Sequence, residues 1–178
     1  MAKLTIVTNV EKPHLISQKT KGILLKAGGN SKNPSLMVNS GIRSPERQAN
    51  AMYDNLAKGN RIAYAAPGRE VVAIYDANSK KPKGEVVKLM IAKINELSKK
   101  EQRVSQHCVS EEVYLAKNIV DVDKAIPNPR DFVIELLKDP DVTRIITPFS
   151  SSKTSVYPTD KRISVDVNEP AIHVEIKQ

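Results

Sequence analysis

The feature that most constrains this chain is a short apolar run that leads through a glycine turn into a helix start. Residues 36–38 (Leu-Met-Val) are typical of a short buried strand, and Ser40-Gly41 predicts a turn. In residues 44–46 (Ser-Pro-Glu), serine can cap free backbone N–H groups, proline suits the first helical position, and glutamate favours the positive helix end. A helix is therefore expected up to Gly59, and Arg43 is expected on a rigid elbow between strand and helix.

The rest of the chain predicts an α+β fold, in which a small antiparallel sheet carries the site and helices pack behind it. We expect one domain over residues 1–178, with a mostly irregular N-terminal arm at 1–34 and a flexible loop at 148–160. The hydrophobic periodicity of residues 70–77 fits either a strand or a helix. Residues 110–118 are expected to form a short polar excursion between two strands. The further expected strands cover 3–10, 103–109, 119–123, 144–147, 162–167 and 171–177, and the further expected helices cover 87–97 and 128–138.

Net charge and composition limit the chemical classes of molecule that this chain is expected to bind. The 178 residues carry a net charge of +8, which suits an anionic partner such as nucleic acid, a membrane surface or a cell-wall polymer. The chain has no arginine-rich tract and no basic stripe interleaved with aromatics, which argues against nucleic acid. Its one cysteine, Cys108, excludes an internal disulfide framework.

No apolar run approaches the length of a transmembrane segment, and the N-terminus lacks the apolar region of a signal peptide. The sequence therefore predicts synthesis and folding in the cytoplasm.

Three polar residues lie in β-prone segments, each on the face opposite apolar neighbours: His107, Asp121 and His173. Two neutral imidazoles and a carboxylate form a suitable zinc set that leaves the fourth tetrahedral position open for water. Asp123 shares the strand face of Asp121, so either carboxylate could be the ligand. Zinc would lower the pKa of its water to roughly 7.

Such a centre also needs a proton acceptor and a cation. Glu169 and Glu175 both lie close to His173 in the sequence, and either could take the proton and hand it to a leaving amine. Arg43 on its elbow could steady the charge that builds on the attacked carbonyl.

Three segments resemble motifs of the zinc DD-peptidase family, which includes D-alanyl-D-alanine carboxypeptidases and dipeptidases and phage L-alanyl-D-glutamate endopeptidases. Residues 40–44 (Ser-Gly-Ile-Arg-Ser) with Gln48 resemble its Ser-Gly-Tyr-Arg-Ser…Gln segment. Residues 105–107 (Ser-Gln-His) match the opening of its Ser-x-His…Asp motif, and Glu169 before residues 173–176 (His-Val-Glu-Ile) resembles its closing motif. All three occur in the order of the family.

The chain also departs from the family pattern. The family has an aspartate seven residues after the histidine, but this chain has Tyr114 at that position. Asp121 therefore corresponds to the family aspartate only if residues 110–116 are an insertion. The interval from Glu169 to His173 is four residues where the family has three, and Ile172 stands where the family has an aromatic.

The resemblance implies zinc-dependent cleavage of peptidoglycan stem peptides, in bonds next to a D-amino acid. It implies zinc on His107, Asp121 and His173, Glu169 as the base, and Arg43 on the substrate carbonyl. The position of Glu175 two residues after His173 leaves it as the alternative base. Substrate contacts are expected from Ser40, Gln48 and Ser105. Without an export signal, such an enzyme would reach the cell wall by phage lysis or a dedicated export route. The alternatives are a metal-free binding or structural protein on the same fold, and a basic nucleic-acid-associated protein.

Overall fold

The computed structural model describes residues 3–7 and 10–178, and residue contacts divide the chain into two compact units. The first comprises Met1–Ile42 and Ser110–Gln178, and the second comprises Arg43–Val109. The expected single peptidase-like domain over residues 1–178 stays a prediction. The elements of the first unit are β1 (Lys3–Ile6), the 3-10 turn η1 (Pro13–Leu15), α1 (Gln18–Asn30), β2 (Ser35–Ser40), α5 (Glu111–Ala116), β3 (Lys117–Val122), α6 (Pro129–Leu137), β4 (Val142–Thr147), β5 (Ile163–Val165) and β6 (Ile172–Lys177).

The first unit is built on one six-stranded sheet of order β1-β2-β3-β6-β4-β5. The predicted α+β class is confirmed, but the predicted small antiparallel sheet is wrong, because this sheet is larger and mixed. The β1–β2 and β4–β5 pairs are parallel, whereas the inner pairs are antiparallel. The parallel β1–β2 pair requires a crossover connection, which α1 supplies.

The N-terminal arm is therefore more ordered than predicted. A mostly irregular segment was expected, but residues 18–30 form α1, in which Ser17 caps the helix by accepting a hydrogen bond from the Thr20 N–H at 3.0 Å. Leu24 and Ala27 are buried, so tertiary packing outweighs the low helix propensity of the glycines in this segment. The strand expected at 3–10 is found at Lys3–Ile6, at an edge of the sheet, and residues 8–9 lie outside the described residues.

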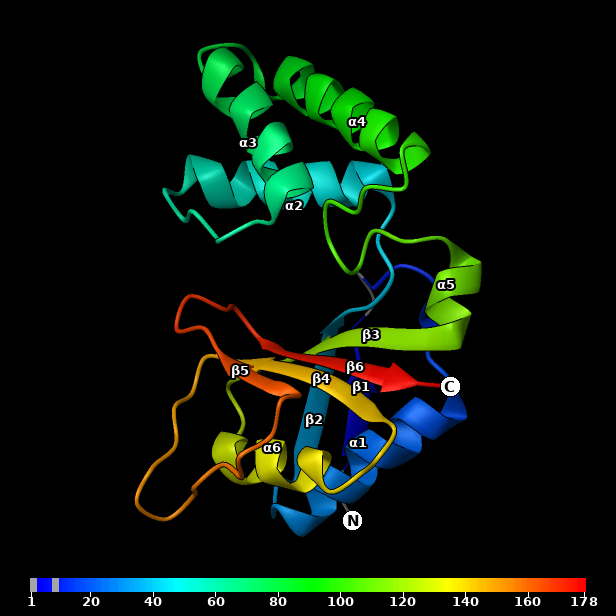
Figure 1. Cartoon of the computed structure of the whole chain (residues 1–178), viewed down its shortest axis with the longest axis vertical. Coiled ribbons are helices and arrows are strands. Elements are labelled where there is room, and N and C mark those ends of the chain that lie inside the picture. Colours follow the sequence, from blue (N-terminus) through cyan, green and yellow to red (C-terminus); the bar gives the residue numbers. More distant parts are fainter. Residues whose placement is uncertain (1–2, 8–9) are drawn as a thin grey trace. The chain divides into compact units, whose positions relative to one another are not determined.

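One face of the sheet is apolar and is covered by helices. Helices α1 and α6 contact each other, and they also contact β1, β2 and β4 (Figure 1). Cross-strand neighbours on this face include Val38 with Val122 and Val120 with Val174, all fully buried. The other face carries Asp121, His173 and the other polar residues described below, which the antiparallel register sets side by side.

Asn118 at the start of β3 ties this unit together. The Oδ1 atom of its side-chain amide accepts hydrogen bonds from the Ser17 N–H at 2.7 Å and the Thr20 hydroxyl at 3.0 Å. Its amide donates to the carbonyls of Leu15 at 3.3 Å and Tyr114 at 2.9 Å. The side chain is fully buried, and all four of its hydrogen-bonding positions are used.

Residues 110–118, predicted as a polar excursion, contain a helix instead. Ser110 accepts from the Val113 N–H at 3.3 Å, and two acidic residues stand in the first turn of α5, where the helix dipole favours them. Residues 148–160 form no helix or strand, and the Tyr157 hydroxyl donates to the Phe149 carbonyl at 2.8 Å. The predicted flexibility of this loop stays a prediction.

The second unit consists of α2 (Pro45–Ala57), α3 (Ala66–Asn78) and α4 (Lys83–Lys99). The predicted start of α2 is confirmed, since Ser44 accepts from the Arg47 N–H at 3.3 Å and Gly59 follows the helix with φ 79°. Residues 70–77, left open by the sequence, belong to α3. The core of this unit consists of Ala49, Met52, Leu56, Val71, Val86, Val87, Met90, Ile94, Leu97 and Val104.

Among the described residues, no helix combines the length and the apolar character needed to cross a bilayer.

Replacing Asn118 with alanine should destabilise the protein. The substitution leaves buried partners at the start of α1 and the end of α5 without their hydrogen bonds, each costing roughly 1–3 kcal/mol. We expect the free energy of unfolding in urea to fall by about 3 kcal/mol, whereas exposed Asn95→Ala should change it by less than about 0.5 kcal/mol. A loss below about 1 kcal/mol for Asn118→Ala would contradict this role.

Candidate metal centre

Two strands bring Asp121 and His173 together. In the antiparallel pairing of β3 with β6, Asp121 lies directly opposite His173. The Asp121 Oδ1 atom is 3.1 Å from His173 Nδ1, and the two residues are only 7% and 4% exposed. The predicted alternation along β6 is confirmed by this pairing, with His173 and Glu175 on one face and Ile172, Val174 and Ile176 on the other.

His107 reaches its place by a turn. An extended segment was expected here, with Ser105 and His107 on one face, and this prediction is wrong. The Cys108 N–H donates to the Ser105 carbonyl at 3.2 Å, and the His107 N–H donates to the Ser105 hydroxyl at 3.3 Å. Ser105, expected to contact substrate, thus holds the backbone turn that carries His107, because its hydroxyl accepts a hydrogen bond from the backbone N–H two residues later.

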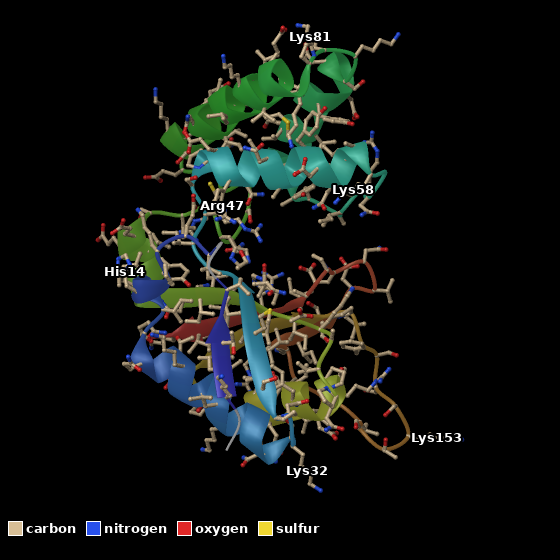
Figure 2. The ribbon with its side chains drawn as sticks, turned by 180° about the vertical axis from the view of Figure 1, so that it is seen from behind. His14, Lys32, Arg47, Lys58, Lys81 and Lys153 are labelled. Atoms are coloured by element: carbon tan, nitrogen blue, oxygen red, sulfur yellow. The ribbon has the colours of Figure 1, made fainter. Side chains whose placement is uncertain are left out.

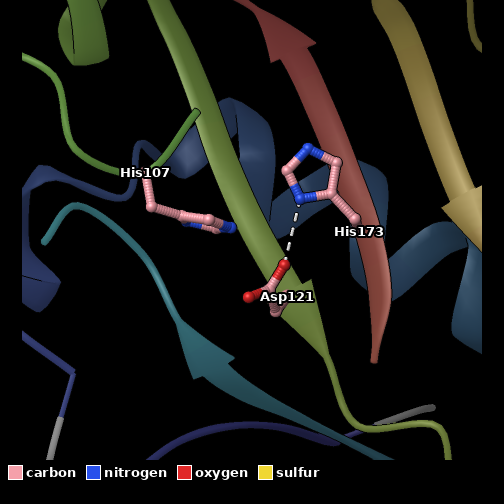
Figure 3. A group of neighbouring side chains, drawn as sticks. All are labelled: His107, Asp121 and His173. Atoms are coloured by element: carbon pink, nitrogen blue, oxygen red, sulfur yellow. Dashed lines mark hydrogen bonds and ion pairs between the residues drawn. The ribbon is translucent and has the colours of Figure 1, made fainter. Parts of the chain in front are cut away.

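His107, Asp121 and His173 form a buried group that could hold a metal ion (Figure 3). Each offers one ligand atom, and these atoms all lie within 4.8 Å of one another. Two imidazoles and a carboxylate suit zinc, whose bonds of roughly 2.0–2.2 Å set ligand atoms about 3.3 Å apart in a tetrahedron. The 3.1 Å separation of Asp121 and His173 is close to that value. The donor set therefore fits the expected metal.

Asp123, the alternative ligand, follows the end of β3. Its carboxylate accepts a hydrogen bond from the Ala125 N–H at 2.8 Å, and its own N–H donates to the Met37 carbonyl. It is not part of the group that could hold a metal among the described residues. These observations favour Asp121.

Glu175 and His173 form a buried charge network. Burial opposes the positive charge of the His173 ring, but the Asp121 and Glu175 carboxylates stabilise the protonated ring more strongly. The pKa of His173 is therefore raised to about 9. Burial likewise opposes the Glu175 carboxylate, yet His173 and Lys117 outweigh it and lower its pKa to about 2. The Glu175 Oε1 atom lies 3.5 Å from His173 Nε2.

Lys117 and Arg144 complete this network, and sequence reasoning missed both. Lys117 Nζ lies 2.5 Å from Glu175 Oε2, and an Arg144 guanidinium nitrogen lies 3.9 Å from Glu175 Oε1. The lysine stands 58 positions away in the chain, so only the register of β3 on β6 could have revealed the pair.

Arg43 and Gln48 contact each other at the start of the second unit. The Arg43 N–H donates to the His107 carbonyl at 2.9 Å, which joins two of the three motifs through the backbone. Its guanidinium contacts the Gln48 side-chain oxygen at 3.5 Å, and Gln48 is 2% exposed. Gln48 is therefore placed to orient Arg43.

Ser40 lies at the end of a strand, and Glu169 lies in the connection between β5 and β6. Ser40, at the end of β2, pairs with Asp121 at an irregularity in the β2–β3 register and is buried. Glu169 lies in the turn before β6, half-buried, with its N–H donating to the Asp166 carbonyl at 3.0 Å. The Lys124 ammonium donates to the Glu169 carbonyl at 3.2 Å, so the backbone of this turn is held on two sides.

Comparison with known proteins identifies no relative. No family model matches the chain, and neither the curated proteins nor the solved structures contain a match.

The metal-free protein should lose stability at high pH because of His173. A raised pKa means that the stabilisation by the ring proton is complete below pH 6.5 and is lost as the pH rises through about 9. For Glu175, whose pKa is lowered, the contribution is present above pH 4.5 and is lost as the pH falls through about 2.

Urea unfolding of chelator-treated protein at pH 5.5, 7.5 and 9.5 measures this effect, with His173→Gln as the control. The stability difference between wild type and control should shrink by an amount on the order of 2 kcal/mol between pH 5.5 and 9.5. A difference that is constant over this range would show that folding leaves the pKa of His173 unchanged, and a difference that grows with pH would show that the ring is neutral in the folded state.

Proposed function

We propose that this chain is a zinc-dependent peptidase that cleaves peptidoglycan stem peptides at bonds next to a D-amino acid. The observation that carries the proposal is the buried His107/Asp121/His173 group, which offers the three ligands that a catalytic zinc takes from a protein. The motif resemblance supplies the substrate class, and the order of the motifs supports it.

In this proposal, different residues bind the metal, transfer the proton and stabilise the substrate carbonyl. His107, Asp121 and His173 hold the ion, which when bound acts as a Lewis acid and brings the pKa of a water to roughly 7. Glu169 would take a proton from the attacking water and deliver it to the leaving amine. Arg43 donates hydrogen bonds to the carbonyl oxygen on which negative charge builds.

The surroundings of the two candidate bases favour Glu169. Glu175 is held by Lys117 at one carboxylate oxygen and lies 3.5 Å from His173 Nε2 at the other, so both of its oxygens are already engaged. Glu169 is half-buried in a backbone turn that hydrogen bonds fix, four residues before His173. It thus combines access to solvent with a fixed position in the chain.

The charge distribution supports a polyanionic substrate. Residues 43–109 contain thirteen Lys and Arg against seven Asp and Glu, so this unit carries +6 of the net +8. Lys58 and Lys81 extend from its exposed turns (Figure 2). Such a surface attracts an anionic cell wall over several ångströms. We propose that the enzyme reaches the wall after lysis or by dedicated export.

One observation favours the metal-free alternative, a binding or structural protein. Asp121, His173, Glu175 and Lys117 pair their charges with one another, so the network is balanced without an ion. Zinc binding would then have to replace the proton on His173, which makes the metal content of the protein the decisive observation.

Purified wild-type protein should bind one zinc per chain and release the expected products from stem peptides. His107→Ala and His173→Ala should each reduce the bound zinc to below roughly a tenth of the wild-type content, since each removes one of three protein ligands. Exposed His14→Ala is the matched control and should keep full zinc content and activity. Unchanged zinc content in both ligand variants, or a wild type that binds no zinc, would refute the metal centre.

Glu169→Gln should separate metal binding from catalysis. Glutamine keeps the shape of the side chain and removes the proton acceptor, so kcat should fall by roughly 100- to 10,000-fold while zinc remains bound. Exposed Glu112→Gln serves as the control and should leave kcat unchanged. Wild-type turnover in Glu169→Gln with full zinc content would show that Glu169 is a turn residue.

A further inference from the structure

We propose that Glu175 is a positioning residue that fixes the imidazole of His173 for metal binding through Nδ1. The inference rests on the proposed metal centre but not on the peptidase activity. It assigns Glu175 a role different from the base considered above, and it draws Lys117 and Arg144 into the support of the centre.

The two nitrogens of the His173 ring face different carboxylates. Nδ1 lies 3.1 Å from Asp121 Oδ1, the other ligand on the sheet, and Nε2 lies 3.5 Å from Glu175 Oε1 (Figure 3 shows the Asp121 contact). A metal shared with Asp121 would therefore take Nδ1. The proton of the neutral ring then belongs on Nε2, which lies at an ion-pair distance of 3.5 Å from Glu175 Oε1, slightly longer than a hydrogen bond. A carboxylate that accepts the second N–H of a ligating imidazole fixes both its tautomer and its orientation.

Glu175 is itself held from two neighbouring strands. Its side chain is 4% exposed and lies between Lys117 of β3, at 2.5 Å, and Arg144 of β4, at 3.9 Å. Arg144 stands directly opposite Glu175 in the β4–β6 register, and the Thr143 hydroxyl donates to the Glu175 carbonyl at 3.2 Å. Backbone and side chain are thus both fixed, so the carboxylate cannot turn away from the ring without abandoning a buried ion pair.

Lys117 supports this arrangement as the ion-pair partner of Glu175. A carboxylate that is buried beside His173 alone would be costly whenever the ring is neutral, as it must be when it binds a metal. The Lys117 ammonium donates to the far oxygen of Glu175, so the carboxylate keeps a buried ion pair when the ring is neutral. This ion pair holds the other oxygen of Glu175 beside Nε2.

The test compares Glu175→Leu, which removes the acceptor, with Glu175→Gln, which keeps an uncharged acceptor of the same shape. Glu135 provides matched controls, because it is a largely buried carboxylate of the same unit that is paired with Lys138. Zinc affinity is measured by competition with a chelator at pH 7, and the absorption spectrum of the Co²⁺-substituted protein reports the geometry around the metal.

We expect Glu175→Leu to weaken zinc binding roughly 10- to 100-fold and to shift the Co²⁺ bands. Glu175→Gln should fall between Leu and wild type, at about 3- to 10-fold weaker binding, since the amide still accepts the Nε2–H without a charge. Glu135→Leu and Glu135→Gln should stay within about twofold of the wild type with an unchanged spectrum, because they lie outside the network.

Wild-type affinity and an unchanged spectrum in Glu175→Leu would overturn the inference and leave Glu175 as a structural residue. If Glu175→Leu does not fold, Glu175→Gln decides on the same two readouts. A wild type that binds no zinc overturns this inference together with the metal centre. A wild type that binds zinc but cleaves no stem peptide refutes only the peptidase, and the role of Glu175 is then still decided by the affinities.

Discussion

The register of β3 on β6 is the constraint on which both the core and the candidate site depend. It sets Asp121 opposite His173 on one face of the sheet and Val120 opposite Val174 on the other. A slip of one residue would turn the apolar side chains away from the helices and the charged ones into the core. The fully buried valines therefore stabilise the alignment that the site requires.

Parts of this arrangement could be predicted because they depend on local chemistry. Ser44 and the proline after it mark the start of α2, and the alternation in residues 172–177 separates the apolar face of β6 from the face of His173. Asp121 could be proposed as the partner of His173 from its own strand pattern and from the motif resemblance. These residues could be predicted because the spacing of apolar residues within a single element of six to thirteen residues is enough to identify that element.

The remainder depends on contacts between distant segments. Helix α1 contains several glycines and a weak apolar stripe, and it is stabilised by packing and by hydrogen bonds from Ser17 and Thr20 to Asn118. The mixed sheet follows from that helix, because a crossover makes β1 and β2 parallel. The turn at 105–108 and the Lys117–Glu175 pair likewise arise from contacts that no sequence window contains.

The same charges that make a metal centre plausible also balance one another without an ion. Burying the Asp121 and Glu175 carboxylates is costly, and the protonated ring of His173 together with Lys117 offsets that cost. A zinc ion would take over the role of the ring proton while leaving Lys117 and Glu175 paired. The proposed activity therefore requires an ion in the group formed by His107, Asp121 and His173.

X-ray absorption at the zinc edge of the zinc-loaded protein, combined with an anomalous map of its crystals, tests that claim most directly. We expect one zinc per chain, bound by two imidazole nitrogens at roughly 2.0–2.1 Å and one carboxylate oxygen at roughly 2.0–2.2 Å, with a water as the fourth ligand. The anomalous peak should lie among His107, Asp121 and His173. A peak elsewhere, or a sulfur ligand from Cys108, would contradict it.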